Sequence, residues 1–178
     1  MDAADGLPVA AAGGIADGRG LAAALALGAE AVWIGTRFVA SAEVELHDGY
    51  KAKVVAAGAG DLVETRLFDG DWEDSPHRVI RNSTHRAWEA AGRPPPGERP
   101  NEGATVGRQP DGTVVPAYHV AAPAAGFEGD WEATALYAGT SALLVREIEP
   151  VEGIISRMLA EARASAQRSG AFWDEAAS

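Results

Sequence analysis

Two glycine-rich turns carry the clearest chemical signal in this sequence. Gly13 and Gly14 follow one short apolar run, and Gly35 and Thr36 follow another. Glycine lets the backbone approach an anion closely, and the free N–H groups of a turn or of a helix start then point at it. The Thr36 hydroxyl is a further donor. Because ligands bind at the carboxyl ends of parallel strands, two such turns on neighbouring strands predict a phosphate site.

The elements that must position these turns form a strand–helix–strand unit. Residues 7–12 and 31–34 are short apolar runs, typical of strands buried on both faces of a parallel sheet. A helix is predicted over residues 19–27, with Asp17 as its N-cap and Gly28 as its left-handed stop. The strands should be parallel with a right-handed crossover. One glycine pair alone is equally typical of a tight connection, so the phosphate prediction depends on the pairing of the two turns.

The pattern changes after residue 40. Capping residues and apolar periodicity predict further helices at 42–57, 82–91, 131–137 and 151–166. A short extended segment is expected at 62–68 and a Pro/Gly-rich loop at 93–116. The expected divisions are strand units at 1–40, a mainly helical insertion with that loop at 41–145, a C-terminal helix at 146–170 and a frayed tail at 171–178.

No catalytic residue can be assigned among the remaining polar residues. The four histidines lack metal-ligand spacing, so no metal site is predicted; they are His47, His77, His85 and His119. His119 is the first candidate because its loop region can reach an active-site mouth, although a surface histidine is the commoner case. Arg37 suits either a phosphate contact or a structural ion pair that faces outward. Trp33 and Tyr137 are expected in the core.

The wording of the two turns resembles that of the nitronate monooxygenase family, formerly called 2-nitropropane dioxygenases. Three blocks carry the match, at residues 8–18, 24–29 and 34–38. Weaker similarity extends through most of the remaining chain. The Gly-Thr-Arg-Phe ending of the third block separates this family from related flavin barrels that share the Gly-Gly turn. The resemblance implies an α/β fold in which this chain supplies the C-terminal portion, the last two strands, of a TIM (β/α)8 barrel.

The resemblance also implies a cofactor, flavin mononucleotide (FMN), and its site. The residues carried over to the FMN phosphate are Gly13, Gly14, Gly35 and Thr36, with Ile34 beside them. The family's later Tyr-Ala-Gly-Gln-Ser segment reads Tyr-Ala-Gly-Thr-Ser here, at residues 137–141. Thr140 therefore replaces the usual Gln, and Leu143 stands where Gly is common. Whether this chain keeps the contact that the family's Gln makes is therefore an open question.

The expected function is FMN-dependent oxidation of nitronates or nitroalkanes with dioxygen. Family members have six strands before the first block, and these carry a Gly-Gly-His segment whose His is the usual base. None of the four histidines here has that context. We therefore expect either a fragment that lacks the catalytic base or a chain that a complementing chain or a further copy completes. Two alternatives stay open: another FMN barrel oxidoreductase, such as an NAD(P)H-dependent enoyl reductase, and a non-catalytic remnant or interaction module.

Composition excludes several other classes. The formal net charge is -11 and no basic stripe is present, which argues against nucleic-acid binding. The absence of cysteine excludes disulfides and a Cys nucleophile, and fits a reducing cytoplasm. No apolar run reaches the roughly 18 residues of a membrane span, and the start lacks the features of a signal peptide. A cytoplasmic enzyme of small molecules is expected.

Overall fold

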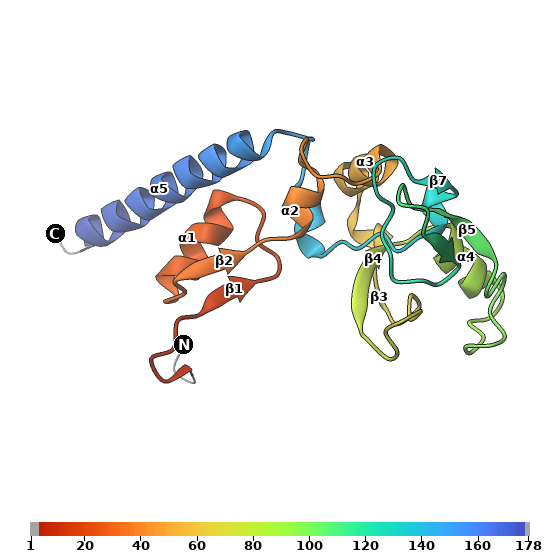
Figure 1. The fold of residues 1–178 in the computed structure, drawn as a ribbon. Helices are drawn as coiled ribbons and strands as arrows, with labels where there is room; N and C mark the ends of the chain where they lie inside the picture. The colour runs from red at the N-terminus through yellow and green to blue at the C-terminus, as the bar shows by residue number, and fades with distance from the viewer. Residues whose placement is uncertain (1–3, 177–178) are drawn as a thin grey trace.

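The computed structural model describes the backbone of residues 4–176 and the side chains of residues 4–170. Its first part is the predicted strand–helix–strand unit, drawn in red and orange in Figure 1: β1 (Ala10–Ala12), α1 (Gly18–Ala26) and β2 (Ala31–Trp33). The strands are parallel and pair from Ala10 with Ala31 to Ala12 with Trp33. The predicted parallel pair is therefore confirmed, although each strand is shorter than the apolar run that contains it.

The predicted N-cap and the predicted C-terminal stop of helix α1 are both confirmed. The Asp17 carboxylate accepts hydrogen bonds from the backbone N–H groups of Arg19 and Gly20, each at 3.0 Å, so it satisfies donors that the first turn leaves unpaired. At the other end Gly28 has φ +93°, the left-handed conformation that ends many helices.

Helix α5 (Val151–Ala176) packs along α1. Gly18 sits at the crossing, where an added Cβ would lie 2.3 Å from the carbonyl oxygen of Met158. The Gly18 N–H donates to the Glu161 carboxylate at 2.8 Å, so α5 caps the start of α1. The helix runs to Ala176, past the expected start of a frayed tail at residue 171; residues 177–178 of that expectation lie outside the described residues.

The middle of the chain is mixed rather than mainly helical. Its helical elements are α2 (Thr36–Val39), α3 (Asp48–Ala56), α4 (Ser83–Ala90) and the 3-10 turns Ala59–Asp61, Trp131–Ala133 and Thr140–Leu144. Its strands form two antiparallel sheets, made of β3 (Leu62–Thr65), β4 (His77–Ile80), β5 (Thr105–Arg108), β6 (Val114–Pro116) and β7 (Glu128–Gly129). The prediction of a mainly helical insertion at 41–145 is corrected accordingly.

Long-range backbone pairing explains where helices were wrongly expected. The segment 131–137 holds only a 3-10 turn because Leu136 accepts from the Ile80 N–H at 2.9 Å and Tyr137 bridges to Val79. Helix α3 starts at Asp48 rather than residue 42 because the Ala42 N–H is bonded to the Glu149 carbonyl. These residues lie extended to reach partners far along the chain.

The expected loop at 93–116 contains the hairpin of β5 and β6. The Gln109 N–H donates to the Thr113 carbonyl at 2.8 Å across a turn in which Gly112 has φ +89°. The prediction of a loop over all of residues 93–116 is therefore wrong for these two strands. Prolines and glycines occur in the turns around short strands as well as in loops.

Two apolar clusters hold the middle part together. The first is built around α3 and the chain after β7: Ala40, Tyr50, Val54, Ile80, Leu136, Ala138, Ala142 and Val145. The second joins the two sheets: Leu67, Phe68, Val79, Ala117, Tyr118 and Ala135. Because Ile80 and Val79 belong to different clusters, strand β4 presents one face to each.

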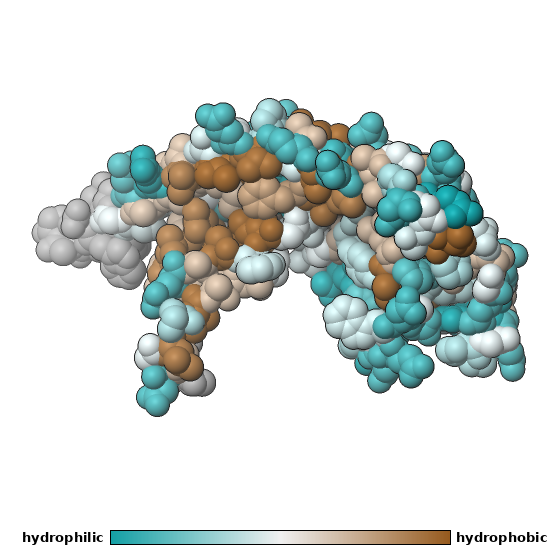
Figure 2. All heavy atoms as spheres, in the orientation of Figure 1, coloured by the Kyte–Doolittle hydropathy of each residue, from teal (hydrophilic) through white to brown (hydrophobic). Residues whose placement is uncertain are grey.

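Within the part of the chain that the structure describes, the strand–helix–strand unit at the start has no comparable apolar cluster. Trp33 is 76% exposed, Leu7 72% and Leu27 77%, so the expectation that Trp33 lies in the core is wrong for the described residues. Apolar surface gathers over this part in Figure 2. Both strands have faces that no element among residues 4–176 covers, which explains why runs typical of buried strands are exposed here.

Asn82 gives a test of local stability. It is fully buried, its side-chain oxygen accepts from the His85 N–H at 2.9 Å, and its amide donates to the Thr134 carbonyl at 2.7 Å. We expect Asn82→Ala to lower the free energy of unfolding by about 3 kcal/mol, because a helix cap and a buried partner are both lost. Urea unfolding followed by tryptophan fluorescence, at concentrations that keep the chain monomeric, measures this loss.

The matched control is Asp17→Ala, which removes a half-buried cap that bonds only its own helix start and Arg19. A loss of about 1 kcal/mol is expected there. Equal losses for the two variants would contradict the structural role given to the Asn82–Thr134 bond.

Candidate functional site

The two glycine turns lie at the same edge of the parallel pair. Because β1 and β2 run in the same direction in register, the turn at Gly13 and Gly14 and the turn at Gly35 and Thr36 both follow carboxyl ends. Gly13 has φ +89° and Gly14 φ +72°, conformations that side chains other than glycine rarely adopt. The Gly-Gly pair is therefore required by the backbone of this turn.

A third segment joins the two turns. The Gly139 N–H donates to the Thr36 hydroxyl oxygen at 3.0 Å, across a separation of 103 residues. An added Cβ on Gly14 would lie 3.8 Å from the Thr140 hydroxyl oxygen. The segment that begins the 3-10 turn Thr140–Leu144 thus closes one side of the edge. Thr140, whose contact the sequence left open, lies at this site.

The remaining side of the edge is open. A Cβ added to Gly13 or Gly35 would meet nothing within 4 Å, and both glycines are exposed. Ile34, the other residue named for this site, is half-buried just before Gly35. Three backbone segments and two threonine hydroxyls therefore border one side of an open edge, which is an arrangement suited to an oxyanion.

Arg37 does not face this space as a free cation. Its side chain is 4% exposed and pairs with the Glu149 carboxylate, while its Nη1 donates to the Ala40 and Glu147 carbonyls. Burial is the largest influence on its guanidinium and lowers the pKa of Arg37. Arg37 forms a structural ion pair, but the expectation that this pair faces outward is wrong, because the side chain is buried against Glu149.

This ion pair should matter for stability. We expect Glu149→Gln to lower the free energy of unfolding by about 3 kcal/mol, since it leaves the Arg37 guanidinium buried without its counter-charge. The control is Glu147→Gln, whose side chain is 60% exposed and pairs with Arg157; that change should cost at most about 0.5 kcal/mol. Thermal or urea unfolding of both variants checks the difference, and similar losses would contradict it.

Each of the four histidines has a structural contact. The His47 Nδ1 accepts from the Gly49 N–H, and the His77 Nδ1 lies 2.8 Å from the Ser75 carbonyl. His119 Nδ1 accepts from the Ala121 N–H at 3.0 Å, so its Nε2 carries the proton and donates to Asp71 at 2.8 Å.

His85 is nearly buried beside Glu89, and burial is the first cause that lowers the pKa of His85. His119, the first candidate for a base, has both ring nitrogens engaged. None of the histidine contacts found in the described part of the chain is to a residue of the glycine turns.

Tyr137 packs against the second apolar cluster, as expected for a core residue. Its hydroxyl donates to the Val120 carbonyl at 2.9 Å, and its own carbonyl accepts from the Tyr50 hydroxyl at 2.5 Å. Burial raises the pKa of both tyrosines. These bonds fix the strand-like segment that leads into Gly139 and Thr140.

Residues 4–176 contain no helix that combines the length and apolar character of a membrane span. The described part of the chain also holds no group of three or more His, Asp or Glu side chains arranged to bind a metal ion.

Sequence comparison finds relatives over the whole described site. The family model named nitronate monooxygenase matches residues 1–161. The nitronate monooxygenase npaC of Metarhizium robertsii is 47% identical over 44% of this chain and 24% of its own. The nitronate monooxygenase of Paraburkholderia phytofirmans is 31% identical over 93% of this chain and 41% of its own. A (3aS,4S,5R,7aS)-5-hydroxy-7a-methyl-1-oxo-octahydro-1H-indene-4-carboxyl-CoA dehydrogenase of Rhodococcus jostii is 45% identical over 52% and 25%, respectively.

Solved structures are similar in fold. FabK from Thermotoga maritima gives a TM-score of 0.64 at 32% identity, over 93% of this chain and 47% of its own. The nitroalkane oxidase from Streptomyces ansochromogenes gives 0.64 at 27% identity, over 94% and 42%. This chain therefore spans less than half the length of each of these relatives and structures.

Proposed function

Because this chain belongs to the nitronate monooxygenase family, we propose that its glycine turns hold the phosphate of FMN in an enzyme that oxidises nitronates with dioxygen. The observation that carries the proposal is the meeting of three segments at one edge: Gly13–Gly14, Gly35–Thr36 and Gly139–Thr140. Membership of the family supports the reaction, and the meeting of these segments supports the proposed position of the cofactor.

The residues present fit a phosphate. The space beside Gly13 and Gly35 is open, and Gly14 approaches the Thr140 hydroxyl closely enough that a larger residue would fill the gap. The Thr36 oxygen already accepts from the Gly139 N–H, which leaves its hydroxyl hydrogen free to donate to a phosphate oxygen. Backbone N–H groups of the turns add neutral donors that are suited to an oxyanion.

The role of this chain is to bind and orient the cofactor. When bound, FMN supplies the electron-transfer chemistry of the oxidation. The Gly14 turn and the Thr36 hydroxyl anchor its phosphate end, and helix α5 holds the start of α1 against this edge through Glu161 and Gly18. The proton on the substrate carbon requires a base, and we assign that base to residues outside this chain.

We further propose that β1 and β2 are the last two strands of a TIM barrel. The exposed faces of both strands and the 76% exposure of Trp33 agree with strands that other barrel elements cover in the complete enzyme. A closed barrel leaves no unpaired strand edge. The missing strands come from a complementing chain, a further copy or a longer form of this protein, and the nitronate and dioxygen bind at the same edge.

A second candidate function follows from one relative. The Rhodococcus jostii protein is named as a dehydrogenase of a carboxyl-CoA compound and is 45% identical over 92 residues. The same flavin site is compatible with oxidation of a CoA thioester. The interaction-module alternative keeps the fold but predicts no flavin.

One experiment separates these functions. A full-length enzyme containing this segment is purified, its flavin is identified by absorbance and by chromatography after release, and oxygen consumption is measured with propyl-2-nitronate. Bound FMN and nitronate-dependent oxygen uptake are expected. Bound FMN with reduction only by CoA thioesters would favour the dehydrogenase. A purified enzyme without flavin would contradict both oxidoreductase functions.

A further inference from the structure

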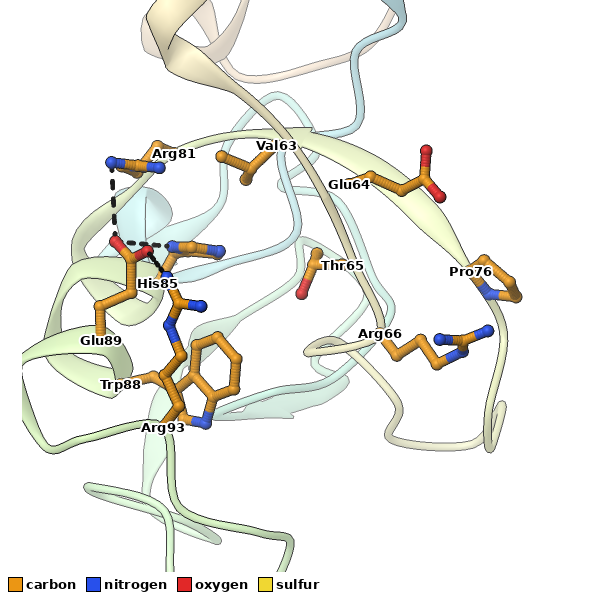
Figure 3. A pocket seen from close by; sticks show the side chains of 10 residues that line it. All are labelled: Val63, Glu64, Thr65, Arg66, Pro76, Arg81, His85, Trp88, Glu89 and Arg93. Atoms are coloured by element: carbon orange, nitrogen blue, oxygen red, sulfur yellow. Dashed lines mark hydrogen bonds and ion pairs between the residues drawn. The ribbon is translucent and has the colours of Figure 1, made fainter.

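A second polar cavity lies between the β3–β4 hairpin and helix α4, away from the glycine turns in the sequence. It has a volume of about 360 Å³, and Figure 3 shows its side chains. Three of them are arginines: Arg66, Arg81 and Arg93. This gathering of guanidinium groups stands out in a chain with a formal net charge of -11.

The arginines around the cavity outnumber the carboxylates that pair with them. Glu89 alone serves two guanidinium groups, since its carboxylate oxygens lie 2.9 Å from Arg93 and 3.7 Å from Arg81. The other lining carboxylate, Glu64, pairs with Arg78, which is not part of the lining. Arg66 pairs with Asp74, whose side chain is 87% exposed. One more anion would complete the charge balance.

Buried donors point to the same need. The Arg81 Nε is buried and has no hydrogen-bond partner among the described residues. His85 is 5% exposed, and its Nδ1 lies 3.3 Å from Glu89 without the geometry of a hydrogen bond. Buried polar atoms usually have partners, so the Arg81 guanidinium, which lines the cavity, has fewer partners than its donors can use.

An apolar wall continues from the arginines. The Trp88 ring lies between Arg93, whose guanidinium carbon is 5.7 Å from the ring centroid, and His85, whose ring meets it edge-on at 5.6 Å. The Trp88 indole N–H donates to the Pro94 carbonyl at 2.9 Å, which fixes the ring. An adjoining cavity of about 510 Å³ shares Trp88, Arg93 and Arg66 and extends along Pro94–Pro96.

We propose that this cavity binds a small phosphorylated molecule, with its phosphoryl group contacting Arg81 and Arg93 from the cavity, beside Glu89, and its apolar part along Trp88. A phosphate monoester carries nearly two negative charges at neutral pH and offers three acceptor oxygens. The charge count admits either anion, so the choice of a phosphoryl group rests on its third acceptor oxygen, which lets it accept from both Arg81 and Arg93. The site is separate from the FMN turns and does not depend on them.

Phenyl phosphate is the test ligand because it joins a phosphoryl group to one aromatic ring. Binding is measured by isothermal titration calorimetry on the 178-residue chain, or on the chain reconstituted with its missing barrel half if the chain alone precipitates. Saturable binding at one site is expected. Arg81→Gln and Arg93→Gln should each weaken it at least about tenfold, as for other charge-assisted contacts. Because the Arg93 side chain is 65% exposed, that variant keeps the test valid if Arg81→Gln fails to fold.

Two controls fix the location. Arg86 lies on the same helix and pairs with Glu132 outside the cavity, so Arg86→Gln should bind phenyl phosphate as the parent does. Gly14→Leu should also leave this binding unchanged, which separates it from the FMN site.

Benzoate and inorganic phosphate complete the comparison, and both should bind more weakly than phenyl phosphate. No binding of phenyl phosphate, equal binding by the Arg81 and Arg93 variants, or benzoate binding as tightly as phenyl phosphate would overturn the proposal.

Discussion

Replacing Gly14 with leucine in a full-length enzyme is expected to remove most of the FMN during purification. Gly14 has φ +72°, which costs a leucine about 1–2 kcal/mol. Its side chain would also project toward the Thr140 hydroxyl and fill the space proposed for the phosphate. Together these effects should weaken FMN binding about 100-fold or more, which is about 2.7 kcal/mol. Flavin absorbance per protein and the dissociation constant for added FMN measure the effect.

The control for backbone strain is Gly112→Leu. Gly112 has φ +89° and open space beside it, in the β5–β6 turn, so it carries similar strain without touching the proposed site. That variant should retain its flavin. Parental flavin content in Gly14→Leu, or equal loss in both variants, would place the phosphate elsewhere.

The second large effect concerns the 178-residue chain expressed alone. We expect it to bind FMN too weakly to retain it and to show no nitronate-dependent oxygen uptake. Binding sites usually bury about 70–90% of a ligand's surface, whereas this chain offers one edge around the phosphate. The exposed strands and Trp33, Leu7 and Leu27 should also drive self-association. Flavin fluorescence, oxygen uptake and light scattering at several concentrations test these expectations.

Addition of the missing barrel half should restore flavin binding and reduce self-association. A monomeric yellow protein with turnover from residues 1–178 alone would refute the need for a partner. It would also require a base within this chain, and His119→Ala would then be the first variant to make, despite its bonds to Asp71 and Ala121.

Local signals made the first part of the fold predictable. The Asp17 cap, the left-handed Gly28 and two apolar runs act within a few residues, and each has the role expected from the sequence. The ion pair of Arg37 was expected to face outward, and its inward orientation could not be predicted because its partner Glu149 lies 112 residues away. Burial of Trp33 was expected from a sheet covered on both faces, which the described residues do not complete.

The rest depended on contacts between distant residues. The Thr36–Gly139 bond spans 103 residues, and no local pattern around Thr140 places it beside Gly14. The bond between Ile80 and Leu136 replaced an expected helix with extended backbone. The similarity of residues 137–141 to a family motif was the only sequence signal for this third segment of the site. The cavity around Arg81 could not be predicted from the sequence, because its residues come from a hairpin and a helix and form no single local pattern.

The most direct test of the central claim is a crystal structure of the completed enzyme with FMN. The phosphate oxygens should lie within hydrogen-bond distance of the backbone N–H groups at Gly14 and Gly35 and of the Thr36 hydroxyl. The flavin ring should extend away from β1 and β2 toward the barrel elements that this chain lacks. An FMN phosphate bound elsewhere, whether beside Arg81 and Arg93 or on another strand pair, would contradict the account.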